Sequence, residues 1–133
     1  MKKVIAFVCT HNSCRSQMAE GWAKHLASDI FEVYSAGTEK YPAPKELALE
    51  VMEDIGISMK GHYSKLLNEI PATLDILITM GCGVECPFVP TKFREDWELD
   101  DPSGGVKEDF EITRDLIKKR VVNLVKMVKN GEI

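Results

Sequence analysis

Three short apolar runs, each followed by a stretch with helical periodicity, constrain the fold of this chain more than any other feature. The runs are KVIAFV (3–8), FEVYSAG (31–37) and LDILITM (74–80), and their apolar character is typical of buried β-strands. Apolar residues then recur at helical spacing from residue 16 onward, between Pro44 and Gly56, and from about residue 108 to residue 129. Because right-handed crossovers place helices on both faces of a sheet, this alternation predicts an α/β sandwich with a mostly parallel sheet.

The length and composition fit a single domain. A chain of 133 residues with 44% hydrophobic residues can bury a core without disulfide bonds, so we expect residues 1–133 to form one domain. Residues 87–105 are rich in glycine and proline, and they predict a long loop that is too short to link two domains.

The charge of the chain limits its partners. A net charge of −4 gives no general attraction to nucleic acid or to an anionic membrane, so any positive field must be local. No apolar run approaches the roughly 20 residues of a membrane span, and MKKVIAFVCTHNS turns polar too soon for a secretory signal. We therefore expect a cytoplasmic monomer that binds neither nucleic acid nor membrane.

The loop CTHNSCR (9–15) joins the first predicted strand to the first predicted helix. Its backbone N–H groups can point inward, and the helix adds unpaired amides and the positive end of its dipole. We therefore predict a cradle for a tetrahedral oxyanion, with Arg15 as a planar clamp. Cys9 lies in the same positive field and should be a nucleophilic thiolate at neutral pH. The predicted oxyanion-binding residues are Thr10, His11, Asn12, Ser13, Cys14, Arg15 and Ser16.

Two further side chains of the loop support this interpretation. Ser16 can donate a hydrogen bond to the sulfur of Cys9, and Asn12 tolerates the left-handed backbone that a tight loop often needs. The spacing of Cys9 and Arg15 alone also fits a buried strand-end cysteine and a surface arginine. The buried strand before the loop and the helical periodicity after it favour a functional site. We expect His11 to be a solvated side chain rather than a base.

The loop also carries a resemblance to a known family. A CxxxxxR[ST] loop on the first strand resembles that of the low-molecular-weight protein tyrosine phosphatases, whose superfamily includes the thioredoxin-coupled arsenate reductases. The segments FVCTHNSCRSQMAEGWAKHL, VYSAGT, ILITMGCGVECP and DWELDDPSG are similar to landmarks of the reductase branch, over nearly the whole chain. This resemblance implies a three-layer sandwich with a four-stranded parallel sheet, and the reduction of arsenate to arsenite.

The resemblance also implies a general acid in the DDPSG motif. Asp101 matches the position of that acid, and it would need a pKa moved toward neutrality to protonate a leaving oxygen. Asp100 could instead be the functional carboxylate, or either aspartate could merely cap a turn. The phosphatases typically place an aromatic residue soon after the proline, whereas Ser103, Gly104 and Gly105 follow here and favour a small inorganic substrate.

Cys82 and Cys86 follow the third predicted strand, at the same edge of the sheet as Cys9. From the resemblance, Cys9 attacks arsenate, Cys82 attacks the Cys9 adduct and releases arsenite, and Cys86 resolves the Cys9–Cys82 disulfide. A Cys82–Cys86 disulfide would remain for thioredoxin or a similar thiol donor to reduce. On a helical turn, this spacing brings the two α-carbons to about 6 Å. The order of attack by the two cysteines stays open.

Other interpretations of the cysteines remain. The same cradle would serve a phosphatase acting on phosphotyrosine or small phosphoesters, or an oxyanion sensor without catalysis. Cys82 and Cys86 could bind zinc with Cys9, Cys14 or His11, although no second short-spaced pair accompanies them. Cys14 could form a reserve disulfide with Cys9, as in oxidised members of the family, or could simply pack in the core.

We predict neither a resident cofactor nor a metal. Some reductases that this chain resembles bind potassium beside the loop, at positions that match Asn12, Glu20, Ser35 and residue 65. This chain has Lys65 where those reductases have an acid, and we expect its ammonium to take the place of the ion.

Overall fold

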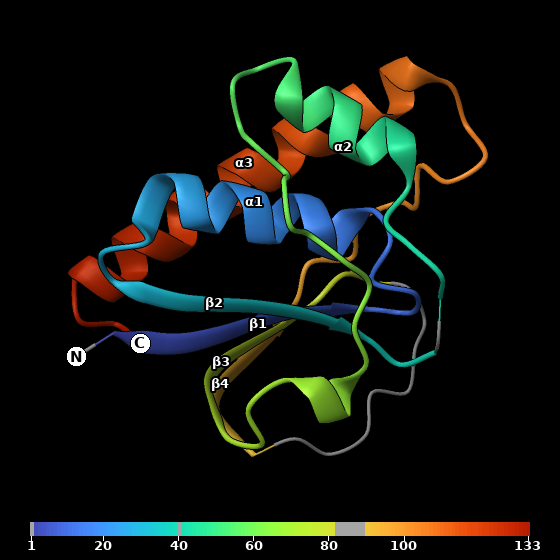
Figure 1. Ribbon diagram of the computed structural model, residues 1–133. Helices are drawn as coiled ribbons and strands as arrows, with labels where there is room; N and C mark the ends of the chain where they lie inside the picture. The colour runs from blue at the N-terminus through green and yellow to red at the C-terminus, as the bar shows by residue number, and fades with distance from the viewer. Residues whose placement is uncertain (1, 40, 82–89) are drawn as a thin grey trace.

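The computed structural model describes residues 2–39, 41–81 and 90–133 (Figure 1). Its elements are, in chain order, β1 (Lys3–Cys9), α1 (Arg15–Ala27), β2 (Phe31–Gly37), α2 (Glu46–Glu53), the 3₁₀ helix η1 (Leu67–Glu69), β3 (Leu74–Thr79), β4 (Thr91–Asp96) and α3 (Lys107–Lys129). The four strands form one parallel sheet in the order β2-β1-β3-β4. The predicted α/β class with a four-stranded parallel sheet is confirmed.

Both faces of the sheet are covered and buried, which explains the continuous apolar character of its central strands. Side chains on one face, such as Phe7, pack with α1, α2 and α3 in the larger core. Side chains on the opposite face, such as Val8, pack with Ile70 and with Leu67 of η1. The three α-helices therefore share one face of the sheet, while the segment that holds η1 covers the other (Figure 1).

The stretch 87–105, which is rich in glycine and proline, also holds the fourth strand, β4, whose position the sequence analysis does not give. β4 is the edge strand, and it pairs only with β3 in the described part of the sheet, with Phe93 opposite Ile76. Its sequence TKFRED alternates half-buried and exposed side chains. Edge strands often carry charged residues, and the single apolar residue here gives no strand signal.

The helices begin and end close to the predicted positions. α1 begins at Arg15, with Cys14 as its N-cap residue, and buries most of its length between the sheet and α3. The N-terminus of α1 therefore lies directly behind the loop that follows β1. None of the described helices is both long and apolar enough to cross a membrane.

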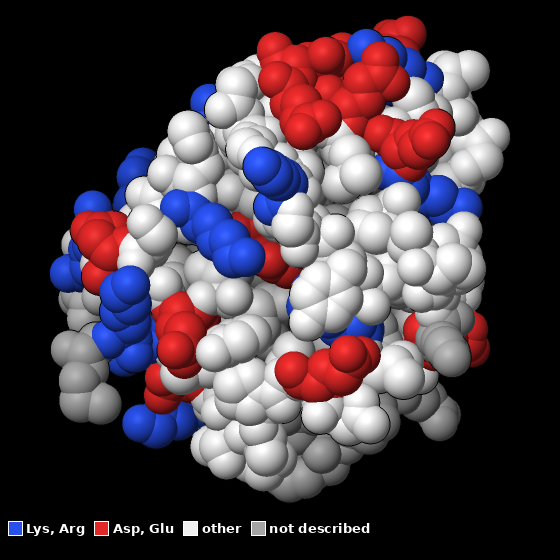
Figure 2. All heavy atoms as spheres, viewed as in Figure 1, with Lys and Arg blue, Asp and Glu red and all other residues white. Residues whose placement is uncertain are grey.

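The face of the molecule in Figure 2 shows no broad positive patch among the described residues. Acidic side chains gather over α2 at the top of the view, whereas lysine and arginine side chains are scattered (Figure 2). The acidic residues of α2 and its C-cap are Glu46, Glu50, Glu53 and Asp54. The positive charge that an oxyanion needs must come from the site itself.

Candidate functional site

Cys9 ends β1, and its sulfur lies at the bottom of the loop that leads into α1. Cys9 is 3% exposed and its sulfur forms no disulfide. The backbone N–H of Asn12 donates to the sulfur over 3.2 Å, and the hydroxyl of Ser16 lies 2.9 Å from it. These contacts match the predicted cradle, in which the loop curls around the sulfur and donors converge on it.

Asn12 determines how the loop curls. Its φ of 53° is left-handed, as predicted, and its side chain is fully buried. The Oδ1 atom of Asn12 accepts hydrogen bonds from Gln17 Nε2 and from the backbone N–H of Lys65, so Nδ2 must be the end that faces Ser16 Oγ at 2.9 Å. Ser16 accepts that bond, which leaves its own hydroxyl hydrogen free to point at the sulfur of Cys9.

Arg15 is a buried cation whose Nε donor is buried without a partner in the described part of the chain. Its Nη1 atom donates to two backbone carbonyls, Met80 O at 2.8 Å and Leu99 O at 2.7 Å. Its Nε atom is the one buried side-chain nitrogen or oxygen without a hydrogen-bond partner among the described residues. An orphaned buried donor is costly, and an anion above Cys9 would satisfy it. Arg15 lines a cleft of about 320 Å³ together with residues that include Thr10, His11, Gly81 and Asp101.

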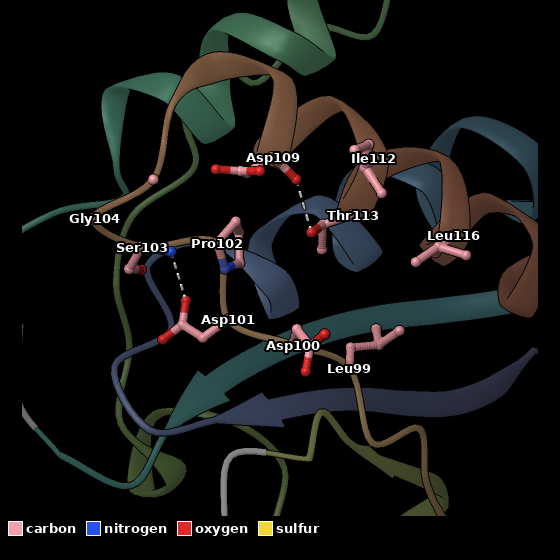
Figure 3. A pocket seen from close by; sticks show the side chains of 11 residues that line it. Leu99, Asp100, Asp101, Pro102, Ser103, Gly104, Asp109, Ile112, Thr113 and Leu116 are labelled. Atoms are coloured by element: carbon pink, nitrogen blue, oxygen red, sulfur yellow. Dashed lines mark hydrogen bonds between the residues drawn. The ribbon is translucent and has the colours of Figure 1, made fainter.

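Asp100 and Asp101 both line this cleft, and Asp101 is the one that lies close to Arg15. Its Oδ2 atom lies 3.7 Å from Arg15 Nη2, and its Oδ1 atom accepts the backbone N–H of Ser103 over 2.9 Å. Figure 3 looks into a neighbouring pocket that Asp101 also lines, and it shows Asp101 and Ser103 turned toward each other, whereas Asp100 lies apart beside Leu99. Of the two neighbouring aspartates, Asp101 is therefore the one engaged with the clamp.

The pKa of Asp101 differs from our expectation. Burial alone would raise the pKa of this carboxyl, but hydrogen bonds from Ser103, the charge of Arg15 and the thiol of Cys14 outweigh burial and leave the pKa below its usual range. The predicted shift of the Asp101 pKa toward neutrality is therefore wrong when only the groups of the protein act on this carboxyl. A bound dianion would offset the charge of Arg15 and raise the pKa of Asp101, because a nearby negative charge favours the neutral carboxylic acid.

Cys14 lies behind Asp101 and is 3% exposed. Its sulfur donates to Asp101 Oδ1 over 3.4 Å and lies 3.4 Å from Ser103 Oγ. Burial raises the pKa of the Cys14 thiol to about 11, so Cys14 is protonated at neutral pH. It is also unpaired, like Cys9.

His11 lies at the rim of the cleft. Its ring stacks on Tyr41 with centroids 4.7 Å apart, and its Nε2 atom lies 3.2 Å from Glu39 Oε2. The side chain is 43% exposed. Contacts with surface partners agree with the predicted solvated side chain.

A buried charged cluster lies on the other side of the loop from the cleft. Lys65 Nζ is 3.5 Å from Glu20 Oε1 and donates to the backbone carbonyl of Tyr63 over 2.9 Å, and Glu20 also accepts from the hydroxyl of Ser35. Lys65 is only 9% exposed. Its ammonium supplies the cationic partner of Glu20, so the residues here do not fit a potassium ion.

Sequence reasoning missed two residues that hold the loop in place. Gly37, at the end of β2, lies against the loop backbone, and a Cβ there would come 2.7 Å from Thr10 O. Gln17 is fully buried, and its Nε2 atom bonds the carbonyl and side-chain oxygens of Asn12 at 3.0 and 2.9 Å. The role of Gly37 depends on a contact between distant parts of the chain, which no local pattern of the sequence shows.

Cys82 and Cys86 lie outside the described residues. The chain reaches Gly81 at the edge of the cleft, directly after Met80, whose carbonyl accepts from Arg15. Among the residues that the structure describes, no group of three or more His, Cys, Asp or Glu side chains could hold a metal ion.

The fold and the loop together define an α/β domain in which the loop after β1 holds a cysteine sulfur among converging donors and an arginine that lines a cleft of about 320 Å³. The chain belongs to the low molecular weight phosphotyrosine protein phosphatase family, whose model matches residues 4–132.

Relatives within this family are arsenate reductases. An arsenate reductase of Staphylococcus aureus (strain Newman) is 44% identical over 127 residues, which cover 92% of this chain and 95% of that protein. A solved arsenate reductase in the phosphate binding state is 41% identical, with a TM-score of 0.86 over 95% of this chain and 98% of its own. A thioredoxin-dependent arsenate reductase of Corynebacterium glutamicum is 29% identical, with a TM-score of 0.81 over 98% of this chain and 63% of its own.

Proposed function

We propose that this chain reduces arsenate to arsenite, with Cys9 as the nucleophile and a thioredoxin-like dithiol protein as the final electron donor. The observation that carries this proposal is the unpaired, buried Nε donor of Arg15, at the end of the loop whose other end holds the sulfur of Cys9. A tetrahedral oxyanion would supply the missing acceptor and would place its central atom in line with the sulfur. The arsenate reductases at 44% and 41% identity support arsenate as that oxyanion.

In the first step, the sulfur of Cys9 attacks arsenic. A sulfur–arsenic bond forms, one arsenic–oxygen bond breaks, and the leaving oxygen takes a proton from Asp101 and departs as water. Arg15 and the loop amides offset the negative charge that collects on the remaining oxygens. The bound dianion raises the pKa of Asp101, so the carboxyl group takes up a proton when arsenate binds.

In the second step, a thiolate of Cys82 attacks the sulfur of Cys9. The sulfur–arsenic electron pair stays on arsenic, which becomes arsenite, and a Cys9–Cys82 disulfide forms. Cys86 then attacks Cys82, which frees Cys9 and leaves a Cys82–Cys86 disulfide for the donor dithiol to reduce. Two electrons pass from thiols to arsenic in each cycle. The proximity of Gly81 to the cleft supports the placement of this relay.

The alternative is hydrolysis of phosphotyrosine or small phosphoesters, which the family membership favours. Hydrolysis needs the same cradle but no cysteine besides Cys9. The residues after Pro102 argue against an aryl substrate, because Ser103 contacts Cys14 and the two glycines that follow have no side chains to contact a ring.

Replacing Cys82 separates the two functions. With thioredoxin, thioredoxin reductase and NADPH, we expect arsenate-dependent NADPH oxidation by the native chain. We expect Cys82→Ser to reduce multiple-turnover arsenite production at least 100-fold, because the thiol proposed to attack the Cys9 adduct is then missing. A Cys82→Ser variant that still turned over at the native rate would refute the relay.

Hydrolysis of para-nitrophenyl phosphate is the matched control. Cys82→Ser should leave this activity unchanged, because hydrolysis does not pass through a disulfide. Fast aryl phosphate hydrolysis by a native chain that oxidises no NADPH with arsenate would instead support the phosphatase.

We also propose that residues 1–133 act as one monomeric domain in the cytoplasm. Cys9 and Cys14 form no disulfide, and the proposed chemistry needs free thiols, which persist in that compartment.

A further inference from the structure

Cys14 is a buried thiol that the proposed mechanism does not use. It is the N-cap residue of α1, directly before Arg15, yet it makes no side-chain cap of the helix. Its sulfur instead reaches 87 positions along the sequence to the carboxylate of Asp101. The contact joins the loop after β1 to the segment after β4, and it suggests a role for Cys14 beyond packing.

The two oxygens of Asp101 have different surroundings. Oδ1 accepts two hydrogen bonds, from the backbone N–H of Ser103 at 2.9 Å and from the thiol of Cys14 at 3.4 Å. Oδ2 lies 3.7 Å from Nη2 of Arg15, and both residues line the cleft. Because Oδ1 is occupied by donors, a proton on this carboxyl group belongs on Oδ2, which is the oxygen nearer to the arginine clamp.

We propose that Cys14 is a positioning residue, whose S–H group fixes Oδ1 of Asp101 so that Oδ2 presents its proton to the leaving oxygen. This inference rests on the proposed function in one respect, since it takes Asp101 as the proton donor. It assigns Cys14 a role as a hydrogen-bond donor, with no bond made or broken at its sulfur.

The chemistry of the thiol agrees with this role. Burial raises the pKa of Cys14 to about 11, so the sulfur keeps its proton throughout the neutral range. A protonated thiol is a poor nucleophile but can donate to a carboxylate. The hydrogen bond from Cys14 is in turn among the groups that lower the pKa of Asp101.

The first test is a titration that does not depend on activity. Carbon-13 NMR of aspartate carboxyls gives the pKa of Asp101 in the native chain, in Cys14→Ala and in Cys14→Ser. We expect the pKa of Asp101 to rise in Cys14→Ala, which loses a donor to the charged form, and to stay near the native value in Cys14→Ser, whose hydroxyl can replace it. An unchanged titration in Cys14→Ala would overturn the proposal.

The second test is a kinetic cycle with Asp101→Asn. We expect Cys14→Ala to lower kcat for arsenate reduction about 5-fold with little change in KM, and Cys14→Ser to restore most of kcat. In the Asp101→Asn background, Cys14→Ala should have no further effect on kcat, because this background has no carboxyl proton for Cys14 to position. An undiminished 5-fold loss in that background would overturn the proposal.

Two outcomes distinguish this inference from other roles of Cys14. If its sulfur carried electrons, Cys14→Ser would be as inactive as Cys14→Ala in a single turnover, which would also overturn the proposal. If the native chain reduced no arsenate, the proposed function would fail, but the titration and the same cycle with para-nitrophenyl phosphate would still decide the role of Cys14. Urea denaturation of each variant identifies losses that come from unfolding.

Discussion

At the scale of single residues, the reactivity of Cys9 depends on donors that touch its sulfur. Ser16 Oγ lies 2.9 Å from the sulfur and accepts from Asn12 Nδ2, so its hydrogen is directed at Cys9. A hydrogen bond to a charged group contributes about 1.5–3 kcal/mol. We therefore predict that Ser16→Ala lowers kcat/KM for arsenate roughly 10- to 100-fold. The rate of alkylation of Cys9 at neutral pH, followed by mass spectrometry, should fall in parallel.

Ser64→Ala is the matched control for this prediction. Ser64 Oγ donates to the backbone carbonyl of Asn12 over 3.0 Å, so it holds the same residue without touching the sulfur. Its loss should cost stability but leave the alkylation rate of Cys9 near that of the native chain. Equal rates in Ser16→Ala and the native chain would show that the hydroxyl of Ser16 does not activate the sulfur.

At the scale of elements, the end of β2 supports the anion cradle from outside. Gly37 pairs with Cys9 in the sheet, and a Cβ at Gly37 would come within 2.7 to 2.9 Å of backbone atoms of residues 10–12. Backbone atoms cannot rotate away, so the loop would have to move. We predict that Gly37→Ala raises KM for arsenate at least 10-fold and costs about 1–3 kcal/mol of unfolding free energy.

Gly56→Ala separates the loop movement from a general loss of stability. Gly56 follows α2 with a φ of +85°, and a Cβ there would have no atom within 4 Å, so alanine is strained at this position but touches nothing. This variant should lose about 1 kcal/mol and keep the native KM. A Gly37→Ala variant with an unchanged KM would mean that the cradle tolerates a displaced loop.

The same elements show which features a sequence can predict. β1, β3 and the helices carry strong local signals, because burial on both faces or on one stripe dictates the residue types. The cradle follows from them, since Cys9 must end a strand and Arg15 must begin a helix. β4 and Gly37 carry no such signal. The strand TKFRED is defined by pairing with β3, and Gly37 is defined by a loop that lies 25 or more positions away in the sequence.

At the scale of the whole molecule, one buried carboxylate joins three parts of the chain. Glu20 of α1 contacts Ser35 of β2 and, in the segment before η1, Lys65 and His62. Burial would raise the pKa of Glu20, but Lys24, Ser35 and the charges of Lys65 and His62 outweigh it and lower the pKa. A group with a lowered folded pKa stabilises the fold above its unfolded pKa of about 4.5, and this stabilisation is lost as the pH falls through the folded value.

His62 adds an earlier stage of acid destabilisation. Its pKa is lowered from 6.5, chiefly by burial, so unfolding favours its protonation once the pH falls below that value. We predict that stability to urea declines in two stages, the first below pH 6.5 and the second below pH 4.5. Glu20→Gln should cost roughly 3 kcal/mol at pH 7.5, because it leaves a buried ammonium without its partner. It should also make the second stage smaller, although Asp101, whose pKa is lowered from 3.8, still contributes to that stage. His62→Gln should remove the first stage only. If the Glu20→Gln curve ran parallel to the native curve between pH 5 and pH 3, the carboxylate would not be the group that links these three elements.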